Sequence, residues 1–127
     1  MYYFKILIFM VFFLTILGGG IVLGNDWKGS SSDNICGLSN PKHITNPAII
    51  DYNKVYNAAS PIKKMKKEGI DPSSAKGSEL IAEATREIGK ACRIVMSNKN
   101  LDSVWKKITS KAGKIPKDIT NEVIKLL

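Results

Sequence analysis

Residues 118–127 (DITNEVIKLL) predict a short C-terminal helix with one strongly apolar face. The Asp118 carboxylate is a suitable N-cap, and Glu122 lies in the first turn. The apolar residues recur at helical spacing, and they are Ile119, Val123, Leu126 and Leu127. A helix of about ten residues is marginal in water unless its apolar face is covered. We therefore expect this segment to dock on the rest of the chain.

The N-terminal part of the chain contains an apolar run that is typical of a membrane-directed segment. Residues 6–24 carry no charged side chain and directly follow Lys5. Two interpretations stay open: a cleaved secretory signal peptide, or a membrane anchor helix with Trp27 and Lys28 at the interface. In both cases the charge of Lys5 favours a cytoplasmic N-terminus, which places the chain from Asn25 onward outside the cytoplasm.

Composition limits both the size of the fold and its partners. The chain has 127 residues, enough for one small domain, and a formal net charge of +8. Of its 19 basic residues, all but Arg86 and Arg93 are lysines. Lysine is a strongly hydrated point charge, whereas bidentate recognition of phosphates and bases favours arginine. The composition indicates a basic surface suited to anionic membranes or acidic polypeptides, and we expect no nucleic-acid binding.

Nothing in the sequence indicates catalysis, a metal site or a cofactor. The one histidine, His43, lies in a polar stretch before the predicted fold. Asp51 and Asp118 are better explained as helix caps than as an acid/base pair. Because no nucleophile set, metal-ligand spacing or phosphate loop is present, we expect a protein that is not an enzyme.

The two cysteines, Cys36 and Cys92, are far apart in the sequence and do not have the spacing of a zinc site. In an oxidising compartment we expect them to form one disulfide that ties the N-terminal arm to the body. The alternative is two independent thiols, with Cys92 acting as a small core residue.

The pattern after the apolar run predicts a linker followed by one α+β domain. Residues 25–46 are rich in Gly, Ser, Asn and Asp and show no apolar period, so they are interpreted as a linker. Residues 48–50 predict a short buried strand. Helices at residues 61–68 and 78–97 would form a hairpin. Residues 101–108 fit a strand or a short helix equally well.

Local signals mark the first arm of that hairpin. Ser60 and Pro61 are typical of a helix start, and Gly69 with Ile70 indicates a Schellman-type stop. The arm spans only about 12 Å at 1.5 Å per residue.

Together these segments resemble the OmpH/Skp family of periplasmic chaperones over residues 47–127. The stretch AIIDYNKVYNAASPIKKMKKE (48–68) is similar to the family's opening strand, turn and first helix. NLDSVWKKI (100–108) and KAGKIPKDIT (111–120) are similar to a strand and its hairpin partner, and DITNEVIKLL to the closing helix. The tentacle helices that enclose clients in this family are strongly shortened here.

The resemblance implies a small antiparallel or mixed sheet, a closing helix packed on it, and assembly into a homotrimer. Three residues of the closing helix would cover three of the sheet: Ile119, Val123 and Leu126 over Ile49, Val104 and Ile108.

The resemblance also implies a noncatalytic periplasmic protein that holds unfolded exported or outer-membrane proteins. The alternative is a structural or assembly component, anchored to the inner membrane through residues 6–24, whose head only oligomerises. The candidate client-binding residues are Lys63, Lys64, Met65, Lys66, Lys67 and Ile70, although a solvated helix face also explains these lysines. A second basic cluster, best explained as protection of strand edges, comprises Lys106, Lys107, Lys111, Lys114 and Lys117.

Overall fold

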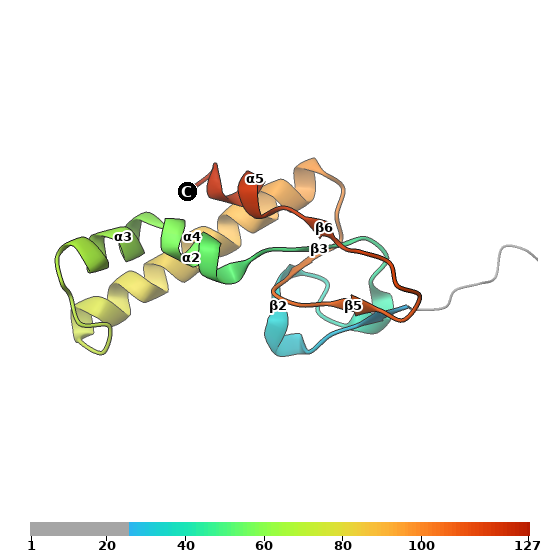
Figure 1. The fold of residues 1–127 in the computed structure, drawn as a ribbon, viewed down its shortest axis with the longest axis horizontal. Coiled ribbons are helices and arrows are strands. Elements are labelled where there is room, and N and C mark those ends of the chain that lie inside the picture. The colour runs from blue at the N-terminus through green and yellow to red at the C-terminus, as the bar shows by residue number, and fades with distance from the viewer. Residues whose placement is uncertain (1–25) are drawn as a thin grey trace, which may run out of the picture.

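A four-stranded sheet with helices on one side organises residues 26–127, the part of the chain that the computed structural model describes (Figure 1). The strand order is β2 (Asn34–Gly37), β4 (Ser103–Trp105), β3 (Pro47–Ile49) and β6 (Lys117–Asp118). β3 runs parallel to both of its neighbours, whereas β2 is antiparallel to β4. The predicted α+β class with a mixed sheet is confirmed. The expected N-terminal hydrophobic helix lies outside the described residues.

A second, two-stranded sheet joins the start of the described chain to its C-terminal part. β1 (Trp27–Lys28) pairs antiparallel with β5 (Thr109–Ser110). Short 3-10 turns, η1 (Ser31–Asp33) and η2 (Pro41–His43), lie on either side of β2.

The interpretation of residues 25–46 as a linker is therefore corrected, since β1 and β2 are both paired strands. They escaped notice because they are only two and four residues long. Pairing through backbone hydrogen bonds leaves no periodic signal in so few side chains.

The helices α2 and α3 each begin at a recognisable sequence signal. Asp51 caps α2 (Tyr52–Ala58), because its Oδ1 accepts a hydrogen bond from the N–H of Lys54 at 3.2 Å. α3 (Ser60–Lys67) follows at once, with Pro61 in its first turn. α3 ends in the predicted Schellman motif: Gly69 has a φ of +63°, and the N–H of Ile70 donates to the carbonyl of Met65 at 2.9 Å.

α4 (Ala75–Asn98) is the longest helix in the described part of the chain, and α2, α3 and α5 all contact it. It begins three residues before the predicted start, because the Ser74 hydroxyl accepts a hydrogen bond from the N–H of Gly77 at 3.0 Å. It ends with Asn100 in the left-handed region, at a φ of +54°. The N–H of Leu101 then donates to the carbonyl of Met96, which turns the chain into β4.

Both faces of the four-stranded sheet are covered, which explains the alternation of residues in β3 and β4. Ala48 and Val104 belong to the main core, together with residues from α2, α3, α4 and α5. Trp105 points to the opposite face and is fully buried. This second cluster also contains Trp27, Ile44 and Ile108, with Ile49 packed against it. Strand residues that are adjacent in sequence thus belong to different clusters.

The C-terminal segment docks as expected, although its helix is shorter than predicted. α5 (Thr120–Ile124) has five residues and packs on α2 and α4. Ile119 and Val123 are fully buried, whereas Leu126 is 50% exposed. Asp118 precedes the helix, and its carboxylate accepts hydrogen bonds from the N–H and hydroxyl of Thr120 at 2.9 and 2.6 Å.

Two expectations about the sheet are corrected. Ile49 and Ile108 do not lie under the closing helix, because they belong to the cluster on the other face. The expected hairpin between β4 and the next strand is also absent from the described residues. β5 pairs with β1 instead, and β6 pairs with the edge of β3 that faces away from β4. Within residues 26–127, no helix is long and apolar enough to cross a membrane.

Candidate functional site

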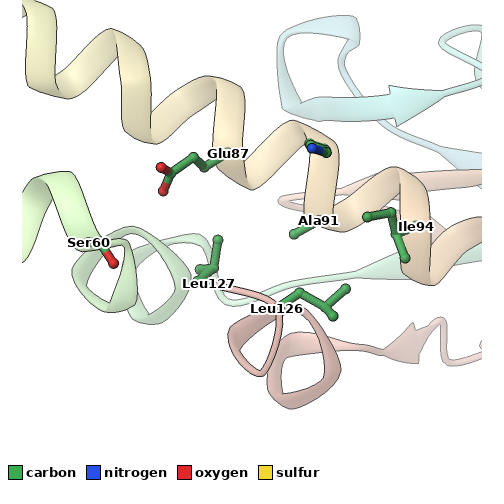
Figure 2. Close-up of a pocket in the computed structure, with 7 residues that line it drawn as sticks. Ser60, Glu87, Ala91, Ile94, Leu126 and Leu127 are labelled. Atoms are coloured by element: carbon green, nitrogen blue, oxygen red, sulfur yellow. The ribbon is translucent and has the colours of Figure 1, made fainter.

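An apolar groove lies between α4 and the C-terminal end of the chain (Figure 2). Its volume is about 380 Å³. Ala91 and Ile94 of α4 form one side, and Leu126 and Leu127 form the other (Figure 2). The groove forms beyond the end of α5 at Ile124, where Leu126 and Leu127 lie opposite α4 (Figure 2). Leu127 still packs partly against the main core, whereas Leu126 does not.

Two large apolar side chains stay exposed in this groove. Ile94 is 41% exposed and Leu126 is 50% exposed, while Ala91 between them is buried. Exposed apolar side chains that share one concave surface are typical of binding sites rather than of ordinary surface scatter. The groove can therefore take up an apolar side chain from a partner.

The groove has polar residues of mixed character at its edge. Glu87 and Lys90 of α4 line it, as does Ser60 at the start of α3. Opposite charges one helical turn apart give the edge little net charge. This arrangement favours selection by apolar character over selection by charge.

The sequence-predicted client-binding residues lie elsewhere, and the structure divides them. The four lysines of α3, Lys63, Lys64, Lys66 and Lys67, are exposed. Met65 is only 6% exposed and belongs to the main core, so its thioether cannot contact a client in this conformation. Ile70 is half-buried against the same core. None of these six residues lines the groove.

Sequence reasoning missed the groove, although one signal was present. The core stripe of α4 runs through Ala84, Ile88, Ala91 and Val95, and Ile94 lies beside that stripe. An isoleucine at the edge of an amphipathic stripe marks a surface that something else can cover. Leu126 gave no such signal, because its spacing placed it on the docked face of the helix.

The two cysteines are close but unlinked. Cys36 and Cys92 are both free and buried, and both belong to the main core. The Cys36 thiol donates a weak hydrogen bond to Met96 Sδ at 4.0 Å. Burial raises the pKa of Cys92 to about 12, and the neighbouring Cys36 adds to this shift. Burial also raises the pKa of Cys36, against the opposing effect of Arg93. The predicted disulfide is not formed in the structure.

A polar hollow of about 340 Å³ lies where α2 and α5 begin. The Thr120 hydroxyl connects its two aspartates: it accepts a hydrogen bond from the N–H of Asp51 at 2.8 Å and donates to Asp118. The hydrogen bonds from Thr120 lower the pKa of Asp118. Asp51 is the N-cap of α2, as predicted. The prediction for Asp118 is wrong: Ile119 is the N-cap of α5, and the Asp118 carboxylate binds Thr120 from one residue further back.

His43 ends the turn η2 and is exposed. No group of three or more His, Cys, Asp or Glu side chains that could hold a metal ion occurs among residues 26–127.

No protein-family model, no curated protein and no solved structure matches this chain. The resemblance to OmpH/Skp chaperones stays a prediction. The groove is therefore assessed by its own geometry.

Proposed function

We propose that this chain is a noncatalytic extracytoplasmic binding protein that holds apolar segments of unfolded exported or outer-membrane proteins. The observation that carries the proposal is the groove in which Ile94 and Leu126 stay exposed on facing elements. A holding protein must bury apolar side chains of many sequences reversibly. A shallow surface with two aliphatic side chains and little net charge suits that task better than a deep, shaped pocket does.

Kinship to the OmpH/Skp family belongs to the same proposal. It is supported by the succession of a strand (β3), a helix through a Ser-Pro pair (α3), a returning helix (α4) and a docked closing segment (α5). The parallel pairing of β6 with β3 departs from the C-terminal hairpin that the resemblance implies. α3 has eight residues, or about 12 Å, so a deep cage between long helices cannot form. Client contact would fall to the head, where the groove lies.

The test is aggregation of an unfolded β-barrel protein, followed by light scattering, with and without the full-length chain. The unaltered protein is expected to suppress scattering at several-fold excess. The variant Ile94→Ser/Leu126→Ser should suppress it much less. A bound client can bury the exposed half of each side chain, which contributes about 1 kcal/mol to binding. Each substitution should therefore weaken client affinity about fivefold.

A matched control is available at Leu38, which is 46% exposed but does not line the groove. Leu38→Ser should hold the client as well as the unaltered chain does, and circular dichroism should show that all variants are folded. Absence of suppression by the unaltered chain would remove the proposed function. An equal loss of suppression in Leu38→Ser and in the groove variant would show that the groove is not the client-binding surface.

A second candidate is an anchored assembly component whose head oligomerises. It is favoured by the closeness of the apolar run to the fold, since residues 6–24 end three residues before β1 starts at Trp27. Mass spectrometry of the exported protein separates the two candidates: an intact N-terminus supports the anchor, and a chain that begins near Asn25 contradicts it. The expected homotrimer belongs to both candidates, and size-exclusion chromatography with light scattering tests it.

A further inference from the structure

The segment between β5 and β6 presents an exposed isoleucine among lysines. Ile115 is 90% exposed, far more than any other large apolar side chain in the described part of the chain. Lys111, Lys114 and Lys117 are exposed around it, and residues 106–117 contain no acidic residue. Protection of a strand edge explains lysines, but it does not explain an isoleucine held in solvent. The combination is typical of a surface that contacts lipid.

This loop lies beside the point where the described chain begins. Trp27 is paired with Ser110, and the N–H of Lys111 donates to the carbonyl of Asp26 at 2.8 Å. Lys114 Nζ also lies 3.6 Å from the Asp26 carboxylate. In the sequence, the uncharged run of residues 6–24 ends just before Asp26. When that run lies in a bilayer, this loop is held at the level of the lipid headgroups.

The other apolar side chain expected at the membrane interface is already buried in the domain. Trp27, expected at the membrane interface, is only 8% exposed and packs in the second cluster. Lys106 lies with its ammonium 4.2 Å from the centre of the Tyr52 ring, so it does not belong to this loop surface. The lysines of α3 lie at the opposite end of the domain from β5 (Figure 1). Ile115 is therefore the apolar side chain free to enter the membrane surface at this end.

We propose that residues 111–117 form a contact surface for anionic phospholipids. Ile115 enters the boundary between headgroups and acyl chains, and Lys111, Lys114 and Lys117 bind lipid phosphates. Lysine suits this contact because its flexible stem lies along apolar surface while its ammonium reaches the phosphate. The surface is separate from the groove at α4 and does not depend on the proposed holding function, but it rests on residues 6–24 lying in the bilayer, as in the second candidate.

The test uses the full-length chain in lipid nanodiscs, with an environment-sensitive fluorophore on Ile115→Cys. Cys36 and Cys92 are buried, so the new thiol is the one that reacts under native conditions. The fluorophore emission is expected to shift to the blue in an equimolar mixture of phosphatidylglycerol and phosphatidylcholine. It should shift much less in phosphatidylcholine alone. Raising the salt concentration should reduce the shift, because exposed charges are screened.

Two charge variants test the role of the lysines. Lys111→Gln/Lys114→Gln should lower the ratio of inserted to free loop about fivefold for each lysine removed. Lys63→Gln/Lys64→Gln removes the same charge from α3 and should leave the shift unchanged. The same fluorophore on Glu79→Cys, in the first turns of α4, should not shift.

Several results would overturn the proposal. These are an equal shift in neutral and anionic nanodiscs, no shift in either, an equal loss in both charge variants, and a shift caused by a soluble acidic polypeptide but not by anionic lipid. Thermal melting of each variant establishes that the domain is folded, so that a lost shift reports on the contact.

Discussion

The carboxylate of Asp102 binds Thr45, which lies 57 residues earlier in the chain. Its Oδ2 accepts hydrogen bonds from the Thr45 N–H at 2.6 Å and the Thr45 hydroxyl at 3.0 Å. The same oxygen accepts a third bond from the N–H of Asn46 at 3.0 Å. The Asp102 side chain thus connects the residues just before β3 with the residue just before β4. These bonds hold the two parallel strands in register.

Removing this carboxylate should destabilise the domain. Asp102→Ala leaves the N–H groups of Thr45 and Asn46 without their acceptor. We expect the free energy of unfolding to fall by about 1–2 kcal/mol, since these bonds involve a charged but partly solvated group. Asp102→Asn keeps one acceptor oxygen and should lose less. Urea denaturation measures both, and an unchanged midpoint for Asp102→Ala would contradict the assigned role.

Asp102 should also make stability dependent on acid. Burial raises the pKa of its carboxyl group, but the hydrogen bonds from Thr45, Asn46 and Ser103 outweigh burial and hold the pKa below 3.8. A carboxyl whose pKa is lower in the folded state stabilises the fold above its unfolded pKa. That contribution is lost as the pH falls through the folded value. Asp102→Asn should therefore lose less stability than the unaltered protein between pH about 5 and pH about 3. Equal acid sensitivity in the two proteins would refute this.

Gly37 should resist substitution because of its surroundings as well as its φ. Gly37 and Gly113 have similar positive φ values, +80° and +76°. A Cβ at Gly37 would collide with the carbonyl of Asp102 and lie 2.8 Å from Met96 Sδ, whereas nothing lies within 4 Å of a Cβ at Gly113. Gly113→Ala should cost about 1 kcal/mol, from backbone strain alone. Gly37→Ala should cost about 1–3 kcal/mol more, from overpacking. Similar melting temperatures for the two variants would show that the steric argument fails.

The Thr120 hydroxyl should matter more than the Thr120 methyl group. Thr120→Val preserves the shape but removes the hydrogen bonds to Asp51 and Asp118, and it leaves the N–H of Asp51 without its acceptor. A loss of about 1–3 kcal/mol is expected. Thr120→Ser retains the hydroxyl and should stay within about 1 kcal/mol of the unaltered protein. Chemical denaturation distinguishes the two, and a Thr120→Ser variant as unstable as Thr120→Val would assign the effect to packing.

Neither cysteine should react with a thiol reagent while the domain is folded. The thiolate is the reactive form, and burial raises the pKa of both thiols, that of Cys92 to about 12. Modification should become fast only in denaturant. Rapid labelling at pH 8 under native conditions would contradict the burial of these groups.

The predicted disulfide between Cys36 and Cys92 can be tested by refolding in a buffer of reduced and oxidised glutathione. A linked product would migrate differently after reduction on a denaturing gel. Unchanged mobility after reduction would leave both cysteines as core residues.

Segments with their own local signals could be predicted from the sequence. β3 was predicted from three apolar residues after a proline, the end of α3 from Gly69, and α4 from its apolar stripe. In each case the determining interaction lies within one element, so a single window of sequence contains it.

The strands that depend on distant partners could not be predicted in this way. Residues 26–37 look like a linker because the partners of β1 and β2 lie more than 60 residues away, in β5 and β4. The same reasoning placed Leu126 in the core, although α5 ends two residues before it. The groove followed from that early end, which no spacing of apolar residues specifies.

The pairing of β6 with β3 determines when this domain can form. β3 ends at Ile49, whereas its neighbours, Ser103–Trp105 and Lys117–Asp118, are synthesised much later. A nascent chain can therefore form helices but cannot complete its sheet. The four-stranded sheet can close only after Lys117 and Asp118 have left the ribosome, so the native packing of β3 is delayed until then.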